Sequence, residues 1–192
     1  MEKEFWEKRY ETHQTGWDLG QASPPLMELM KKITNKDAKI LIPGCGSAHE
    51  AKALMELGFS NLWLIDISEK AVQQIQSQLP HFPAEHLVCV DFFEWEEKDF
   101  DVILEQTFFC AILPESRTRY AQNMHKKLKS GGILQGVLFD REFDGGPPFG
   151  GSAQDYEKIF KPYFDFILWE RCPCSIQPRA NTELWFQLKR KD

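Results

Sequence analysis

Two kinds of hydrophobic pattern alternate along this chain, and their order limits the folds open to it. Short apolar runs typical of buried strands lie at residues 38–42, 61–66, 86–91, 99–106 and 133–139. Segments with helical spacing separate several of them, at 47–57, 69–79 and 115–129. Two further runs, 165–172 and 183–189, have only a turn between them and predict an antiparallel hairpin.

This order predicts an α/β fold, a three-layer αβα sandwich around a doubly wound, Rossmann-like sheet. The sheet has seven strands, mostly parallel, and ends in the antiparallel hairpin. Residues 1–192 form one domain, and residues 1–24 form an N-terminal arm that precedes the core.

Local signals set some of the boundaries. Ser68 is placed to cap the helix that follows it, and Pro80 ends that helix. The pair Gly131-Gly132 is expected to turn the chain into the fifth strand, and Pro162 cuts a short helix near residue 160.

Charge and cysteine content disfavour several classes of function. The formal net charge is −6, without an extended basic cluster, which disfavours nucleic acid as a partner. No apolar run approaches the ~18–20 residues that span a bilayer, so we expect a cytoplasmic protein without a membrane partner, and a monomer. Five cysteines without framework spacing are expected to be reduced, and no metal site is predicted.

A candidate ligand site lies at the carboxyl ends of the predicted strands, where such sheets bind ligands. Gly44 and Gly46 follow the first strand and allow a sharp turn and a close approach to a ligand. Asp66 ends the second strand, near the spacing expected for a carboxylate that binds ribose hydroxyls. Asp91 and Phe92 follow the third strand and suit an adenine. The alternative is an ordinary turn, with Asp66 capping the next helix.

The glycine pattern also bears on which nucleoside binds. A dinucleotide fingerprint needs a third glycine, and His49 occupies that position. This disfavours an NAD-dependent dehydrogenase. S-Adenosylmethionine fits the pattern better, because it carries a nucleoside and a sulfonium but no phosphate.

Three aromatic residues in the arm, Trp6, Tyr10 and Trp17, have two interpretations. They either dock the arm on the core, or they face the sulfonium, a cation that suits aromatic faces. Trp6 and Tyr10 are four residues apart and share one face of a short helix. Spacing alone leaves both interpretations open.

Several stretches together resemble the thiopurine S-methyltransferase family, especially its thiol and halide methyltransferase members. They are FWEKRYETHQTGWDLG, ILIPGCGSAHEAKALMELGF, LIDISEKAV, DFFEW, FDVILEQTFFCAILPESRTRYAQNM, LKSGGIL, DGGPPF and FDFILWER. The resemblance implies a class I methyltransferase that uses S-adenosylmethionine and releases S-adenosylhomocysteine. This sequence departs from the family pattern at Gln106, because the family often has Tyr or Arg at that position.

The resemblance and the residue pattern described above together imply roles for residues. The expected cofactor-binding residues are Trp6, Tyr10, Trp17, Gly44, Gly46, Asp66, Ile67, Asp91, Phe92, Glu105 and Gln106. The expected substrate-binding residues are Trp17, Phe108, Phe149 and Arg179. No catalytic residue is certain, and the candidates are Gln106 and Asp144.

The predicted function is methyl transfer to a small soft nucleophile: a thiol, sulfide, halide, thiopurine, or selenium or tellurium species. Thiolate is intrinsically nucleophilic, and halide needs no deprotonation, so a dedicated base is not required. The alternatives are an amine or protein N-methyltransferase of the same fold, and a module that binds the cofactor without turnover.

Overall fold

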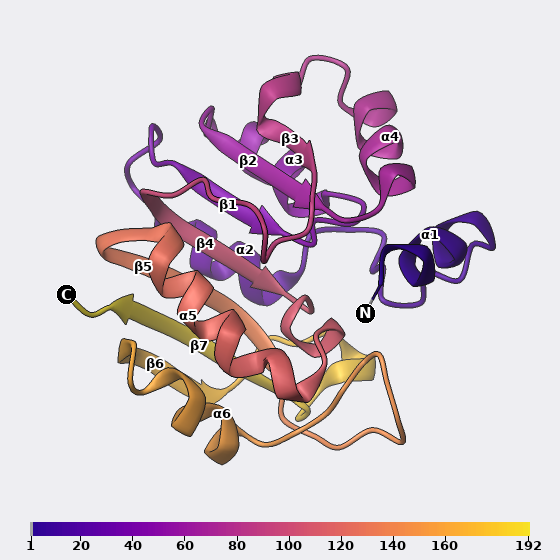
Figure 1. Cartoon of the computed structure of the whole chain (residues 1–192). Helices are drawn as coiled ribbons and strands as arrows, with labels where there is room; N and C mark the ends of the chain where they lie inside the picture. The colour runs from indigo at the N-terminus through magenta and orange to yellow at the C-terminus, as the bar shows by residue number, and fades with distance from the viewer. Residues whose placement is uncertain (1) are drawn as a thin grey trace.

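The protein is described by a computed structural model that covers residues 2–192, and its fold is shown in Figure 1. Its helices are α1 (Lys3–Glu11), α2 (Pro24–Met30), α3 (His49–Glu56), α4 (Glu69–Gln78), α5 (Arg117–Lys127) and α6 (Ala153–Phe160). Its strands are β1 (Ile40–Pro43), β2 (Leu62–Asp66), β3 (Leu87–Cys89), β4 (Phe100–Gln106), β5 (Leu128–Phe139), β6 (Phe164–Arg171) and β7 (Glu183–Arg190).

The seven strands form a single sheet in the order β3-β2-β1-β4-β5-β7-β6. The pairings among β3, β2, β1, β4 and β5 are parallel, whereas β7 is antiparallel to both β5 and β6. The predicted mostly parallel sheet with a terminal antiparallel hairpin is therefore confirmed.

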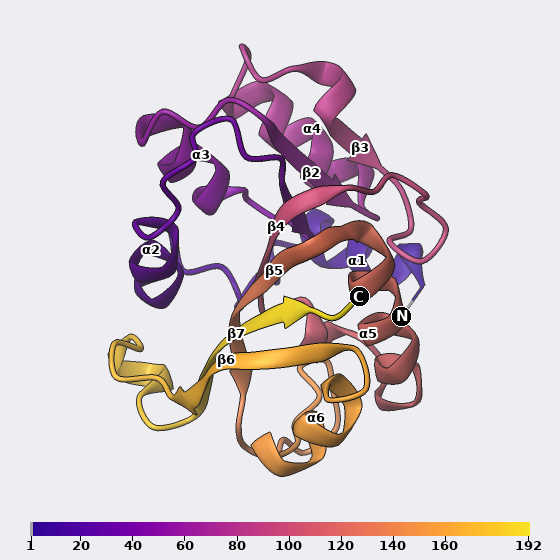
Figure 2. The same ribbon diagram turned by 90° about the vertical axis from the view of Figure 1, so that its left-hand side faces the viewer.

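Helices cover both faces of this sheet, and a separate apolar core lies under each layer. Along β1, Ile40 and Ile42 pack in the core beneath α2, α3 and α4, whereas Leu41 packs in the core beneath α5 and α6. Successive strand residues point to opposite faces, so one short strand contributes to both cores. Figure 2 shows α2 and α3 on one side of the sheet and α5 on the other.

Several local predictions hold. The Ser68 side chain accepts a hydrogen bond from the Ala71 N–H at 3.2 Å, as an N-cap does, and α4 ends at Gln78, just before Pro80. The sequence did not predict α2, whose Leu26, Leu29 and Met30 are buried.

The prediction for Gly131-Gly132 was wrong. These glycines lie within β5, which begins at Leu128. The pairing with β4 shifts register between Phe100 and Val102, so the two glycines belong to an irregularity in the strand rather than to a turn before it.

The sheet order sets the place of the site. Connections from β1 lead toward β2 on one side, and those from β4 lead toward β5 on the other. The carboxyl ends of β1 and β4 therefore flank the switch point, where open α/β sheets bind ligands. The N-terminal helix α1 lies beyond this edge (Figure 1).

Within residues 2–192, no helix combines the length and the apolar character needed to span a membrane.

Close packing of β5 against β4 predicts the cost of adding a methyl group. Cβ on Gly136 would lie 1.9 Å from the carbonyl oxygen of Glu105, an overlap that only a backbone shift relieves. We expect Gly136→Ala to lower the free energy of unfolding by about 2 kcal/mol or more, measured by urea denaturation. Gly16→Ala is the control, because no heavy atom lies within 4 Å of its added Cβ, and it should change stability by less than about 0.5 kcal/mol. Equal stabilities of the two variants would contradict the packing described.

Candidate active site

A cavity of about 570 Å³ opens at the carboxyl edge of the sheet. This volume lies within the range of about 300–1,000 Å³ typical of small-molecule sites. Its walls come from the arm, from the loops after β1 to β5, and from the segment before β7. The predicted site residues that line it are Trp6, Tyr10, Trp17, Gly44, Gly46, Asp66, Ile67, Asp91, Phe92, Gln106, Phe108 and Arg179.

The turn after β1 forms the floor of the cavity. Gly44 and Gly46 have φ values of +57° and +53°, in the region that favours glycine. The Phe108 ring packs so closely on Gly44 that an added Cβ would lie 2.5 Å from its Cδ2 atom. Glycine at position 44 therefore serves both the turn and the approach of the ring.

Asp66 joins this turn to the loop after β2. Its two carboxylate oxygens accept hydrogen bonds from the N–H groups of Gly46, at 3.0 Å, and Ser68, at 2.9 Å. Burial raises the pKa of Asp66, while these backbone N–H groups oppose the rise. Asp66 and Asp91, both in the cavity wall, define what we call the nucleoside end.

The aromatic residues of the arm contact each other and the cavity. Trp17 makes edge-to-face contacts with Trp6 and Tyr10, at ring-centroid distances of 5.4 and 5.8 Å. The Tyr10 hydroxyl lies 3.4 Å from the position of a Cβ on Gly46. The two interpretations of these residues are thus compatible, because they dock the arm and also form one wall of the cavity.

Polar contacts hold the arm at both of its ends. The Glu69 N–H at the start of α4 donates to the Glu7 carboxylate of α1. Further along the arm, Asp18 accepts a hydrogen bond from the Ser47 hydroxyl and lies 2.7 Å from His49 Nε2. Partial burial by itself raises the pKa of Asp18. The hydrogen bonds from Ser47, Gly20 and His49 outweigh this effect and hold the pKa below its usual value.

The end of β4 carries a buried hydrogen-bond acceptor that has no partner among the described residues. Gln106 Oε1 is buried and has no partner within residues 2–192, and the residue lines the cavity. Unpaired buried polar atoms are rare in proteins and indicate a place for a missing partner.

The other end of the cavity is apolar and cationic, and we call it the acceptor end. Its walls include Cys110, Phe139, Arg141, Phe143, Pro147, Pro148 and Arg179.

Burial raises the pKa of the Cys110 thiol to about 12, and Sγ donates to the Thr107 carbonyl oxygen at 2.9 Å. Cys110 is therefore a neutral wall residue and not a nucleophile.

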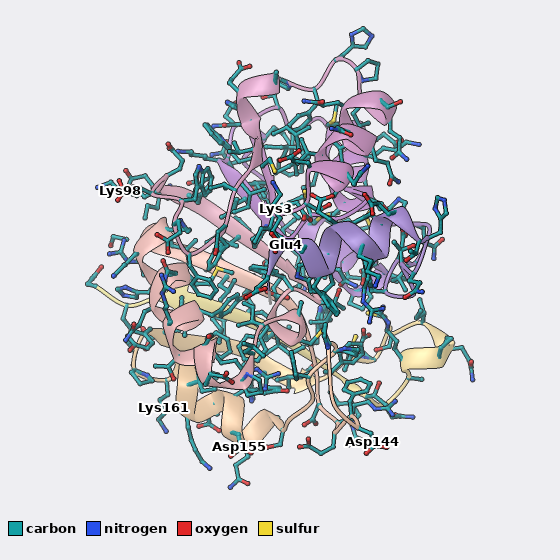
Figure 3. The ribbon with its side chains drawn as sticks, turned by 45° about the vertical axis from the view of Figure 1, so that its right-hand side comes forward. Lys3, Glu4, Lys98, Asp144, Asp155 and Lys161 are labelled. Atoms are coloured by element: carbon teal, nitrogen blue, oxygen red, sulfur yellow. The ribbon has the colours of Figure 1, made fainter. Side chains whose placement is uncertain are left out.

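Three predicted residues do not line the cavity. Glu105 is fully buried beneath it. The Phe149 ring packs on Gly146, and its N–H donates to the Cys110 carbonyl oxygen at 2.7 Å. Asp144 is exposed at the outer margin of the molecule, on the loop after β5 (Figure 3).

The sequence reasoning missed Phe139, Arg141 and Phe143. Phe139 is the last residue of β5, and the other two follow within four residues. Ligands bind beyond the carboxyl ends of the strands in such sheets, and the sequence-based prediction applied this rule only to the first four strands. Applied to the fifth strand as well, the rule would have found these residues.

The residues present fit S-adenosylmethionine. The carboxylate of Asp66 lies at the nucleoside end, where it would bind ribose hydroxyls, and the amide side chain of Gln106 lines the same cavity. The cluster of Trp6, Tyr10 and Trp17 offers aromatic surface to a sulfonium.

The fold is shared with solved S-adenosylmethionine-dependent methyltransferases. One is the 1,6-didemethyltoxoflavin-N1-methyltransferase of Burkholderia thailandensis, crystallised with 1,6-didemethyltoxoflavin and S-adenosylhomocysteine. It matches with a TM-score of 0.79 at 16% identity, over 99% of this chain and 87% of that chain. At this identity the likeness concerns the fold, which is that of the Rossmann-like methyltransferases.

Sequence comparison identifies the family. The family model for thiopurine S-methyltransferase (TPMT) matches residues 1–184. Probable thiol methyltransferase 2 of Arabidopsis thaliana is 38% identical over 184 residues, which are 93% of this chain and 81% of that protein. Thiocyanate methyltransferase 1 of Brassica oleracea is 33% identical over 189 residues, 95% of this chain and 83% of that protein. The chain belongs to the thiopurine S-methyltransferase family, and the predicted class, an S-adenosylmethionine-dependent S-methyltransferase, is confirmed.

The buried Glu105 predicts a pH dependence of stability. Burial raises its pKa to about 7, against hydrogen bonds from the Tyr120 hydroxyl and the Phe109 N–H. Between the ordinary value of 4.5 and about 7, the native state therefore binds more protons than the unfolded state, and stability falls as pH rises. We expect the free energy of unfolding of the wild type, relative to Glu105→Gln, to decrease from pH 5 to pH 8.

Urea denaturation at several pH values measures this difference. Glu115→Gln removes an exposed carboxyl in the same way and serves as the charge-matched control. A wild-type pH slope identical to that of Glu105→Gln would contradict the assignment.

Proposed function

We propose that this protein transfers the methyl group of S-adenosylmethionine to a small, soft nucleophile, foremost a thiol or thiocyanate. Sulfide, halide, thiopurine and selenium or tellurium species belong to the same chemical class. The observation that carries the proposal is the cavity itself, with a carboxylate at the nucleoside end and an apolar, cationic acceptor end. The names of the thiol and thiocyanate methyltransferase relatives support it.

Bound S-adenosylmethionine supplies an electrophilic methyl group, and the chain's own residues position it. Asp66 binds ribose hydroxyls, while Asp91 and Phe92 hold the adenine. Gln106, at the end of β4, would border the amino-acid part of the cofactor. The rings of Trp17 and Phe108 flank the space between cofactor and acceptor and exclude water from it. Alignment of nucleophile, methyl carbon and leaving sulfur is the main requirement of such a displacement.

The cavity walls do not offer a dedicated general base. Within residues 2–192, they contain neither histidine nor glutamate, and their two aspartates lie at the nucleoside end. A thiol with a pKa of ~8.5 is a few per cent ionised at pH 7, and thiocyanate or halide needs no deprotonation. The acceptor therefore reacts as a pre-formed anion.

Thiopurine is expected to be a poorer substrate than a small thiol. Gln106 stands where the family often has Tyr or Arg, so a larger ring or a charged group is replaced by a neutral amide. Arg179, the candidate for a substrate contact, is already paired with Glu183 at 3.4 Å. That the protein is a cytoplasmic monomer without nucleic-acid or membrane partners stays a prediction from composition.

The test combines binding and turnover. We expect S-adenosylhomocysteine to bind with a 1:1 stoichiometry by calorimetry. With labelled S-adenosylmethionine, thiols and thiocyanate should be methylated with a higher kcat/KM than thiopurine or small amines. Absence of S-adenosylhomocysteine binding would contradict the function, binding without turnover of any acceptor would indicate a module without activity, and faster methylation of amines would favour an N-methyltransferase.

A further inference from the structure

Two arginines and two phenylalanines form a continuous row of contacting side chains at the acceptor end. The Arg179 guanidinium carbon lies 5.3 Å from the centre of the Phe139 ring. Phe139 contacts Phe143 edge to face at 5.1 Å, and the Arg141 guanidinium carbon lies 4.6 Å from the centre of the Phe143 ring. All four residues line the cavity.

The charge of Arg179 is already used within the protein. Its Nη1 atom lies 3.4 Å from the buried carboxylate of Glu183, and its Nη2 atom donates to the Trp17 carbonyl oxygen at 3.1 Å. Only 11% of its side chain is exposed. Arg179 therefore fixes the arm against β7, and the inner half of the row is close to neutral.

Arg141, the outer arginine, has no such partner. Its guanidinium makes one long contact, 3.5 Å from Nε to the Glu142 carbonyl oxygen, and no ion pair within residues 2–192. The residue is exposed, which places its charge at the rim of the cavity. Its backbone is fixed, because the carbonyl oxygen accepts a hydrogen bond from the Gly151 N–H at 2.9 Å. Arg141 is thus an anchored cation with free donors in a chain whose net charge is −6.

We propose that Arg141, with the face of Phe143, binds an anionic group, of the carboxylate class, carried by a thiol acceptor. The inference rests on the proposed function and names the substrate class of the same site. A rim position suits a group remote from the reacting atom, whereas the reacting sulfur lies deeper, beside Gln106 and Phe108. A guanidinium fork pairs with a carboxylate through two parallel hydrogen bonds, which gives geometric as well as electrostatic selection.

The reaction balances without a further reactant. The thiol proton goes to water, and a bond forms between the acceptor sulfur and the methyl carbon. The bond from that carbon to the cofactor sulfur breaks, and its electron pair stays on the cofactor sulfur. The products are a carboxylated thioether and S-adenosylhomocysteine, and the carboxylate at Arg141 is unchanged.

The test uses matched acceptors that differ in the remote group. One pair is mercaptoacetate and 2-mercaptoethanol, and the other is 4-mercaptobenzoate and 4-methylbenzenethiol. The quantity measured is the ratio of kcat/KM for the carboxylated thiol to that for the neutral thiol. We expect Arg141→Gln to lower this ratio about tenfold, as for the loss of a charge-assisted hydrogen bond, and Arg141→Lys to lower it less. Using the ratio removes effects of the substitution on cofactor binding.

Arg171→Gln is the matched control, because Arg171 is exposed on β6 outside the cavity walls and its loss changes net charge equally. It should leave the ratio at the wild-type value. An unchanged ratio in Arg141→Gln, or an equal fall in Arg171→Gln, would overturn the proposal. In either case continued methylation of the neutral thiols would leave the proposed function standing. No methylation of any thiol would remove this proposal, and no methylation of any acceptor, thiocyanate and halide included, would remove both.

Discussion

The buried carboxylate of Asp66 links two loops at the carboxyl edge of the sheet, and the arrangement of the site depends on this link. Its oxygens receive the N–H groups of Gly46 and Ser68, which belong to the turns after β1 and β2. An ionised carboxylate at this depth needs such donors, because burial alone disfavours its charge. The link holds the glycine turn in the position where the Phe108 ring packs against Gly44 and Tyr10 of the arm lies beside Gly46.

The arm completes the site from the opposite side. Asp18 fastens it to Ser47 and His49 beside the glycine turn, and Arg179 fastens the Trp17 carbonyl to the end of the hairpin. The arm therefore bridges the nucleoside and acceptor ends, which lie over different halves of the sheet. An arm with these contacts explains why aromatic residues occur in a segment that is otherwise charged.

Sequence patterns predicted the parts of the fold that depend on local periodicity and local caps. The strands and the cap at Ser68 follow from apolar spacing and from one hydroxyl. The helix α2 was missed because its seven residues are too few to show a period, and its burial depends on contacts with the rest of the core. The irregularity in β5 was missed because a glycine pair has the same appearance in a turn and in a bulge.

The sequence predicted the site residues that follow directly from the positions of the strand ends. It did not predict those whose place depends on side-chain packing or on the path of a loop. Glu105 and Gln106 are neighbours on β4, whose side chains alternate in direction, and the sequence does not say which of them faces the ligand. The structure places Gln106 in the wall and Glu105 below it. Arg141 lies at the site because of the way the loop after β5 folds. The backbone bridge between Arg141 and Gly151 holds this loop in place.

The central claim is that the arm is a wall of the cofactor site, and hydrogen exchange followed by mass spectrometry tests it directly. Addition of S-adenosylhomocysteine should slow exchange of the amides of residues 3–18, because ligand contacts to Trp6, Tyr10 and Trp17 suppress opening of the arm. Exchange in α6, which lies outside the cavity walls, should change little and provides the internal reference. Unchanged exchange in the arm at concentrations where calorimetry shows S-adenosylhomocysteine to be bound would contradict the account.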